Sequence, residues 1–135
     1  MKIYLAARYS RHAELEVCAA DLRFEGIEVV SRWHKGEHQA LDADLLDNVE
    51  LARRFAEEDV SDLCDADLMI SFTEPPHSSA PRGGRHVELG LALARAMAIW
   101  IVGPRENIFH CLPGVLVFDT WPAVIRELRA RKAER

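Results

Sequence analysis

The segment PRGGRHVELGLALA at residues 81–94 contains a carboxylate within what otherwise reads as an apolar, buried helix. The carboxylate belongs to Glu88, and the preceding Gly83 and Gly84 let a ligand approach the backbone closely. Because a helix N-terminus carries a partial positive charge, we expect Glu88 to stay ionised. Its spacing puts it on the helix face of Leu91, which is not obviously the solvent face. Glu88 is therefore either an ordinary helix-start glutamate or a group with a chemical role.

A second set of carboxylates lies upstream, in EEDVSDLCDADLMISF at residues 57–72. Asp65 and Asp67 fit the connection from a helix into a strand, and Asp62 fits a solvated position. Asp59 lies about a turn and a half before the helix ends, so it can point toward a cleft. Carboxyl groups serve as nucleophiles and as general acids, and Asp59 and Glu88 are the candidates here. Neither motif is specific by itself.

Apolar periodicity predicts strands that alternate with helices. The expected strands cover residues 2–6, 27–33, 67–72, 98–103 and 115–118; the expected helices cover 10–24, much of 44–64, 85–97 and a stretch from about 121. Ser10 is the expected N-cap of the first helix and Gly26 its stop. This order favours right-handed crossovers and a five-stranded parallel sheet covered on both faces. The predicted fold is an α/β, flavodoxin-like or Rossmann-like three-layer sandwich.

The long second helix has an apolar stripe that we expect to face inward. Its members are Val49, Leu51, Ala52, Phe55, Val60 and Leu63. In open parallel sheets, ligands bind outside the carboxyl ends of the strands. This rule brings together the loop at residues 7–10, the pair Trp33 and His34, and the pair Thr73 and Glu74.

Composition limits the class of protein. The 135 residues, 49% of them hydrophobic, are enough for one domain over residues 1–135. The net charge is −5 and the basic residues are scattered, so we expect neither a polynucleotide partner nor an anionic membrane. No run has the length of a signal peptide or a membrane span, which predicts a soluble, cytoplasmic protein.

Cysteine and histidine usage gives little support to metal or redox chemistry. The three cysteines lack CxxC spacing, so neither a disulfide framework nor a zinc site is expected. His34 and His38 are four residues apart, but Gly36 and the polar setting indicate a loop. We expect no metal and no cofactor.

Three motifs in the same order resemble the nucleoside 2-deoxyribosyltransferase family and the related 2'-deoxynucleoside 5'-monophosphate N-glycosidases. They are IYLAARYS, DVSDLCDADLMISF and GGRHVELGLALA, and the resemblance covers roughly residues 2–103. It implies a single nucleoside deoxyribosyltransferase-like domain. Its catalytic tyrosine, aspartate and glutamate match Tyr4, Asp59 and Glu88.

The resemblance implies cleavage of the N-glycosidic bond of a 2'-deoxyribonucleoside or its 5'-monophosphate. Glu88 would form a covalent deoxyribosyl intermediate, Asp59 would act as general acid on the leaving base, and Tyr4 would orient Glu88. Water or a second nucleobase would then take the sugar. Hydrolase and transferase both remain open.

Further residues follow from the same resemblance. Tyr9 and Trp33 match positions that contact the base, while Ala7 and Gly84 belong to the surrounding loops. Arg82 stands where the nucleotide hydrolases have a serine and the transferases an acidic residue.

The resemblance also implies residues for the 5' end and the sugar end of the site. Arg8, Arg82 and Arg85, with the glycine-loop amides, either hold a 5'-phosphate or are surface arginines. Family members complete the sugar end from a neighbouring subunit, and residues 103–110 would do so here through Asn107. A homodimer or higher homo-oligomer with shared sites is therefore expected.

Two alternatives remain. GGRHVE is similar to the loop of lysine-decarboxylase-like phosphoribohydrolases, which act on ribonucleotides, although its spacing is two residues shorter. A nucleotide-binding or sensing module without turnover is the other. The base, the 5' group, the acceptor and the oligomer size stay open.

Overall fold

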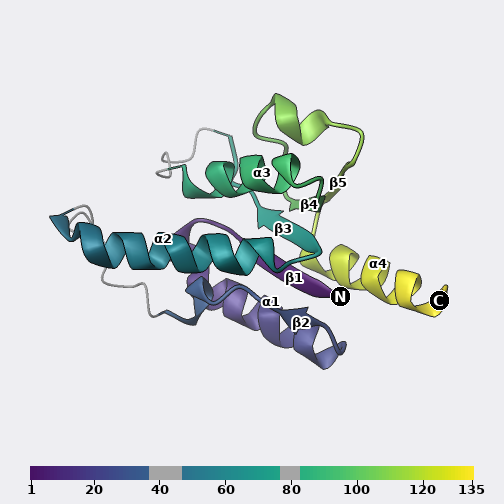
Figure 1. Cartoon of the computed structure of the whole chain (residues 1–135). Coiled ribbons are helices and arrows are strands. Elements are labelled where there is room, and N and C mark those ends of the chain that lie inside the picture. The colour runs from purple at the N-terminus through teal and green to yellow at the C-terminus, as the bar shows by residue number, and fades with distance from the viewer. Residues whose placement is uncertain (37–46, 77–82) are drawn as a thin grey trace.

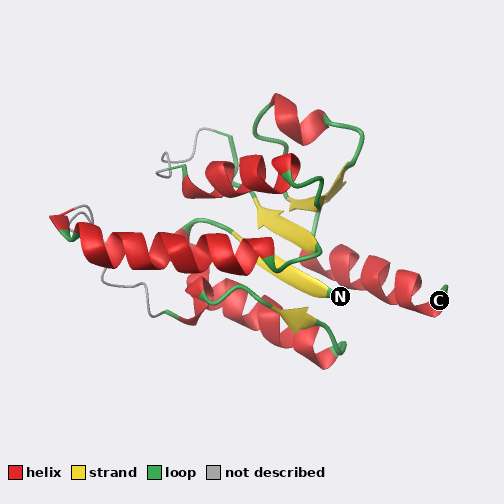
Figure 2. Ribbon diagram, in the orientation of Figure 1, coloured by secondary structure: helices red, strands yellow, loops and turns green. Residues whose placement is uncertain are grey.

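The computed structural model describes residues 1–36, 47–76 and 83–135 as one α/β sandwich. Its parallel sheet has the strand order β2-β1-β3-β4-β5, which confirms the predicted architecture (Figure 2). The strands are β1 Lys2–Ala6, β2 Glu28–Val29, β3 Leu68–Phe72, β4 Ala98–Val102 and β5 Val115–Phe118. The helices are α1 His12–Phe24, α2 Val49–Cys64, α3 Gly84–Ala94 and α4 Trp121–Ala133, with 3₁₀ turns η1 Tyr9–Arg11, η2 Trp33–Lys35 and η4 Ile108–Cys111.

Two helical layers cover the sheet (Figure 1). Helices α2 and α3 pack together on one face. Helices α1 and α4 lie on the other, where the Trp121 indole donates to Asp21 at 2.9 Å and Arg129 pairs with Glu25. The central strands β1, β3 and β4 are almost wholly buried, as expected for parallel strands covered on both faces. In the described ranges no helix is both long and apolar enough to cross a lipid bilayer.

Strand β2 is shorter than predicted because the chain leaves the sheet after Val30. Val30 N–H donates to the Ile3 carbonyl at 2.9 Å, but Arg32 N–H, the next donor of a parallel ladder, turns to Asp62 Oδ2 at 3.2 Å. Asp62 also accepts the Arg32 guanidinium at 2.7 Å and is only 7% exposed. The prediction of a solvated Asp62 is wrong. Asp62 on α2 is covered by its pairing with Arg32 in the segment after β2, and local sequence pattern does not show such a contact.

Helix boundaries differ from the predicted ones by a few residues, and α3 ends at Ala94 rather than at residue 97. Ser10 lies inside η1, and α1 begins at His12 without a side-chain cap, so Ser10 is not the N-cap. Gly26 follows α1 at a φ of 79°, in line with its predicted role as a stop. Helix α2 begins after Asn48, whose side chain accepts Leu51 N–H.

The predicted inward stripe of α2 is only partly correct. Phe55 and Leu63 are buried, whereas Val49 and Val60 are 59% and 44% exposed. Residues 44–46, which the sequence assigned to this helix, lie outside the described residues.

Gly103 offers a direct test of the packing between β3 and β4. It has a φ of 114°, and a Cβ there would lie 2.5 Å from Thr73 Oγ1. That hydroxyl is fixed by a 2.6 Å hydrogen bond to the Pro104 carbonyl. We expect Gly103→Ala to lower the free energy of unfolding by about 2–4 kcal/mol, measured by urea denaturation.

Gly114→Ala is the matched control, because nothing lies within 4 Å of its added Cβ and its φ is not positive. We expect this control to stay within about 0.5 kcal/mol of the native protein. Equal stability of the two variants would show that the loop accepts a side chain at Gly103 without strain.

Candidate active site

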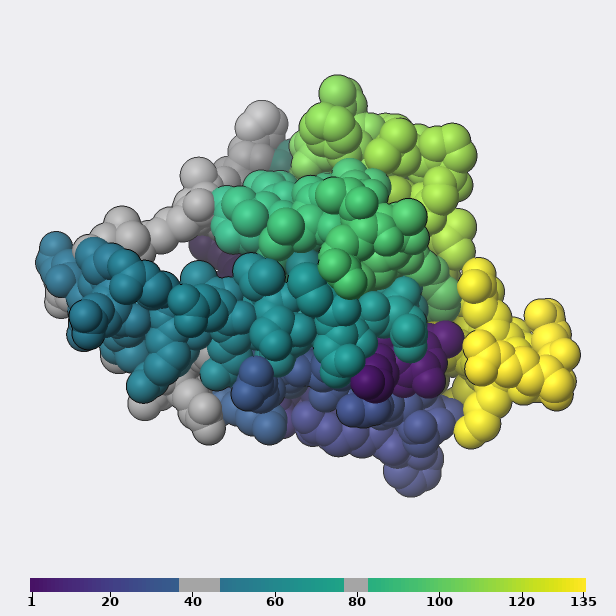
Figure 3. Space-filling model, in the orientation of Figure 1, coloured from purple at the N-terminus to yellow at the C-terminus, as the bar shows by residue number. Residues whose placement is uncertain are grey.

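Tyr4, Asp59 and Glu88 come together on the α2–α3 face of the sheet. Tyr4 is fully buried on β1. Burial raises its pKa well above the usual value, and the charges of Glu88 and Asp59 raise it further. Helices α2 and α3, which carry Asp59 and Glu88, lie side by side on this face (Figure 3). The three sequence-nominated residues therefore share one neighbourhood, although they come from three different elements.

The Tyr4 hydroxyl lies beside the Glu88 carboxyl. Its interaction with Glu88 lowers the pKa of that carboxyl, and neither Tyr4 Oη nor Glu88 Oε2 has a further hydrogen-bond partner within the described ranges. A buried polar atom without a partner is costly. The pair therefore retains hydrogen-bonding capacity that a ligand can satisfy.

Glu88 does not stay ionised as the helix position suggested. Burial raises its pKa to about 8, and the charge of Asp59 adds to the rise. The helix dipole acts mainly within the first turn, and Glu88 is the fifth residue of α3. Desolvation therefore outweighs the dipole, and Glu88 is a neutral glutamic acid near pH 7 in the folded protein.

Asp59 is half-buried on α2 and also has a raised pKa, at about 7. Burial is the main cause; the neighbouring Asp62 and Glu58 raise the pKa further, and Arg32 lowers it. A carboxyl group in such a setting can hold a proton near neutral pH, which a general acid requires. Its catalytic role remains a prediction.

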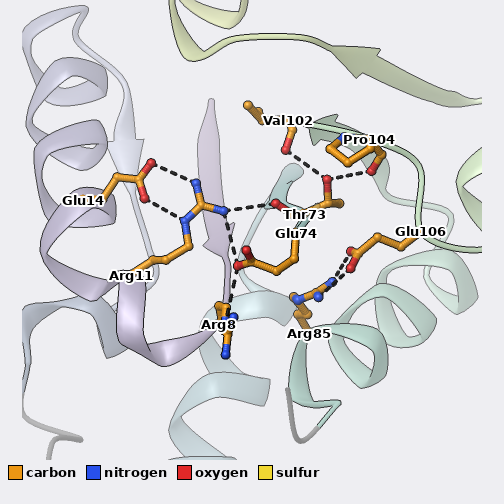
Figure 4. Close-up of polar contacts among 9 residues, drawn as sticks. All are labelled: Arg8, Arg11, Glu14, Thr73, Glu74, Arg85, Val102, Pro104 and Glu106. Atoms are coloured by element: carbon orange, nitrogen blue, oxygen red, sulfur yellow. Dashed lines mark hydrogen bonds and ion pairs between the residues drawn. The ribbon is translucent and has the colours of Figure 1, made fainter. Parts of the chain in front are cut away.

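The loop after β1 is held by ion pairs to the end of β3 (Figure 4). Arg8 Nε lies 3.9 Å from Glu74 Oε1, and Arg11 Nη1 lies 3.5 Å from the same oxygen. Arg11 also donates to the Thr73 carbonyl at 3.1 Å. Ala7 is half-buried in this loop. Arg8 thus belongs to a fixed acidic and basic cluster at the carboxyl ends of two strands.

The two aromatic candidates differ in exposure. The Tyr9 ring is half-buried, stacks on His12 at 5.1 Å and lies 6.2 Å from the Trp33 ring. Trp33 is 5% exposed, and its indole N–H donates to the Leu5 carbonyl at 2.7 Å. Trp33 therefore forms part of the core, and Tyr9 offers the more accessible surface for a flat base.

Arg85 is neither a surface arginine nor free to hold a phosphate. Its side chain is 3% exposed and forms a two-pronged ion pair with Glu106 (Figure 4). Glu106 N–H in turn donates to His110 Nδ1 at 3.0 Å. The pair joins the start of α3 to the loop after β4, so it supports the helix that carries Glu88.

The remaining nominated residues have different outcomes. Gly84 is the exposed first residue of α3. Asn107 caps η4 by accepting Phe109 N–H at 2.9 Å. Arg82 lies outside the described residues, as does His38. In the described part of the chain, no group of three His, Cys, Asp or Glu side chains could hold a metal, and the expected absence of a metal and of a cofactor stays a prediction.

Sequence reasoning missed two ion pairs that join distant segments, Arg32 with Asp62 and Arg85 with Glu106. Both join residues at least 21 positions apart. Local periodicity carries no signal for such pairs. The one available hint was that each arginine directly follows or precedes a segment already assigned to the site.

Comparison with known proteins shows the fold and no more. No protein-family model matches the chain, and no curated protein matches it in sequence. Among solved structures, the CMP N-glycosidase BcmB of Clostridium botulinum superposes with a TM-score of 0.58 at 19% identity. The match covers 96% of this chain and 99% of that one. The chain is thus similar in fold to an enzyme of this name over nearly its whole length.

The raised pKa of Glu88 has a consequence for stability. Since the folded protein holds this proton up to about pH 8 and the unfolded chain only to about 4.5, stability falls as the pH rises through this window. Glu88→Gln removes that loss. We expect the variant to gain stability over the native protein as the pH rises from 5 to 8.5, up to a limit of about 5 kcal/mol at about 1.4 kcal/mol per pKa unit.

Urea denaturation of both proteins at several pH values measures this difference. Glu14→Gln is a suitable control, because Glu14 lies on the exposed part of α1 and its pKa is lowered by Arg11. If the unfolding free energies of the native protein and of the Glu88→Gln variant change with pH in parallel, Glu88 titrates normally.

Proposed function

We propose that this chain cleaves the N-glycosidic bond of a nucleoside or nucleotide, with Glu88 as the nucleophile. The observation that carries the proposal is the buried carboxyl of Glu88, which lies beside the Tyr4 hydroxyl and within the electrostatic reach of Asp59. The fold similarity to a CMP N-glycosidase supports the same class of reaction. Cleavage passes through a state with positive charge on the sugar, and a desolvated carboxylate stabilises it strongly.

The residues divide the reaction as follows. Ionised Glu88 attacks the anomeric carbon as the bond to the base breaks, and Asp59 donates its proton to the departing base. The Tyr4 hydroxyl orients the Glu88 carboxyl. Water or a second base then attacks the glycosyl ester, Glu88 leaves as carboxylate, and Asp59 takes up the proton of the attacking group.

The sugar and its 5' group define the substrate more finely. Family resemblance favours 2'-deoxyribose, whereas the structural neighbour is named for CMP, a ribonucleotide 5'-monophosphate. Arg8, which lies beside Glu74, and the N-terminal amides of α3 are our candidates to bind a 5'-phosphate. We propose deoxyribonucleosides or their 5'-monophosphates as substrates, and cleavage of ribonucleotides is the second candidate.

Assembly belongs to the same proposal. The expected homo-oligomer, with Asn107 reaching a neighbouring site, and the cytoplasmic location stay predictions. A sensing module without turnover is the competing hypothesis, and an activity assay separates it from the enzyme.

The assay is a panel of ribo- and deoxyribonucleosides and their 5'-monophosphates, incubated with and without a second free base and separated by chromatography. Free base alone indicates hydrolysis, and a new nucleoside indicates transfer. We expect Glu88→Gln to lower kcat by about three orders of magnitude or more, because the covalent step loses its nucleophile. Near-native turnover in this variant, which keeps the shape of the side chain, would exclude Glu88 as nucleophile.

The pH dependence tests the role of Asp59. The active form needs ionised Glu88 and protonated Asp59, and the carboxyl pair titrates at about 7 and about 8. We therefore expect a bell-shaped profile of kcat/KM with its maximum between these values. Asp59→Asn should lose the alkaline descending limb, since the amide has no proton to lose.

Glu57→Gln is the matched control, because Glu57 lies on the exposed face of the same helix. It should keep the bell shape. A descending limb that persists in Asp59→Asn would assign the acid to another group.

A further inference from the structure

Three side chains behind β1 have the connectivity of a catalytic triad. Ser31 Oγ lies 2.9 Å from His34 Nε2, and His34 Nδ1 lies 2.6 Å from Glu16 Oε2. Ser31 and His34 are each 1% exposed. A serine, histidine and acid in this order usually activate the serine for attack. Here no substrate can reach the hydroxyl, so the arrangement serves another purpose.

The backbone of β1 shows what that purpose is. In a parallel sheet, alternate residues of a strand bond to the same neighbour, so Ile3 and Leu5 both face β2. The β2 segment bonds Ile3 and then leaves, before it reaches Leu5. Ser31 Oγ accepts Leu5 N–H at 3.1 Å instead. The Trp33 indole donates to the Leu5 carbonyl, so side chains replace the two missing ladder bonds.

The protons in this chain of contacts have one consistent arrangement. Burial lowers the pKa of His34 despite the opposing effect of Glu16, so the ring is neutral near pH 7. His34 and Arg23 lower the pKa of Glu16 overall, although partial burial raises it, so Glu16 is ionised. His34 Nδ1–H therefore donates to Glu16, and Nε2 accepts the Ser31 hydroxyl proton. The hydroxyl oxygen is left to accept Leu5 N–H.

We propose that Glu16, His34 and Ser31 form a positioning relay that fixes β1 at Leu5 and so sets the neighbouring Tyr4 hydroxyl against Glu88. Tyr4 is paired in register with Met69 of β3, on the other edge of β1. The strand is thus held from both sides at two consecutive residues. Leu5 and Tyr4 point to opposite faces, so the relay acts from the α1 side on a group that faces α2 and α3.

The tautomer of His34 is the first test, and it needs no enzyme activity. In protein with ¹⁵N-labelled histidine, we expect a slowly exchanging, strongly downfield Nδ1 proton that disappears in His34→Gln. It should also disappear in Glu16→Ala. Arg23→Ala is the matched control, since it removes a 3.4 Å ion pair to Glu16 Oε1 and leaves Oε2 on His34. A His34 ring protonated on Nε2 alone would overturn the relay.

The link to Tyr4 is the second test. The chain has two tyrosines, so a ¹³Cζ-tyrosine label gives two signals, which Tyr9→Phe assigns. We expect the Tyr4 signal to move in Ser31→Ala and in Glu16→Ala, and to stay in Arg23→Ala. If Ser31→Ala does not fold, Glu16→Ala decides alone, because its side chain is 40% exposed. A Tyr4 signal that stays in place after the His34 proton is lost would refute the positioning role.

Kinetics give the third test, which rests on the proposed glycosidic activity. We expect Glu16→Ala to lower kcat about tenfold with KM within about twofold, while Arg23→Ala keeps both. If Glu16 has a purely structural role, Glu16→Ala lowers the melting temperature without a selective loss of kcat. Native kcat in Glu16→Ala would overturn the catalytic relevance of the relay. A native protein without any glycosidic activity would refute the proposed function, and the two spectroscopic tests would still judge the relay.

Discussion

A buried carboxyl group that has no basic partner within the described residues is the constraint on which this site depends. Among the described residues, the groups that shift the pKa of Glu88 are a tyrosine and an aspartate, and none is a cation. Ionised Glu88 is therefore costly in the folded protein. In the proposed reaction, a positive charge that develops on a bound sugar would supply a counter-charge. The site would then be complementary to a cationic transition state rather than to the ground state.

The surrounding structure holds this unfavourable arrangement in place. Arg85 and Glu106 join the start of α3 to the loop after β4, and Arg32 and Asp62 join the segment after β2 to α2. Each ion pair is at least half-buried on one side, and each lies close in sequence to a group of the site. Rigid support of this kind keeps the Glu88 carboxyl, which has no counter-charge among the described residues, from moving to a more favourable environment. The departure of β2 from the sheet belongs to the same design, because it frees Ser31 and Trp33 to bond Leu5 from the side.

The sequence predicts the parts of this molecule that depend on local pattern. Long apolar runs such as residues 68–72 identify the central strands. The alternation of these strands with helices is enough to predict a parallel sheet covered by helices on both faces. Glu88 is visible because a carboxylate in an apolar helix breaks that pattern. The burial of Asp62 and of Arg85 is not visible, because each depends on a partner from a distant segment. The raised pKa of Glu88 was missed for a related reason, since the dipole of its own helix is local and its burial is tertiary.

Two neighbouring carboxyl groups with raised pKa values form the titratable part of this site. Burial is the main cause for both, and it brings the pKa of Asp59 to about 7 and that of Glu88 to about 8. The proposed reaction needs an ionised Glu88 beside a protonated Asp59. In that reaction, a base bound near Asp59 would remove water from it and raise its pKa further, while positive charge on the sugar would lower the pKa of Glu88. The substrate of the proposed reaction would therefore favour this division of the protons over the reverse one.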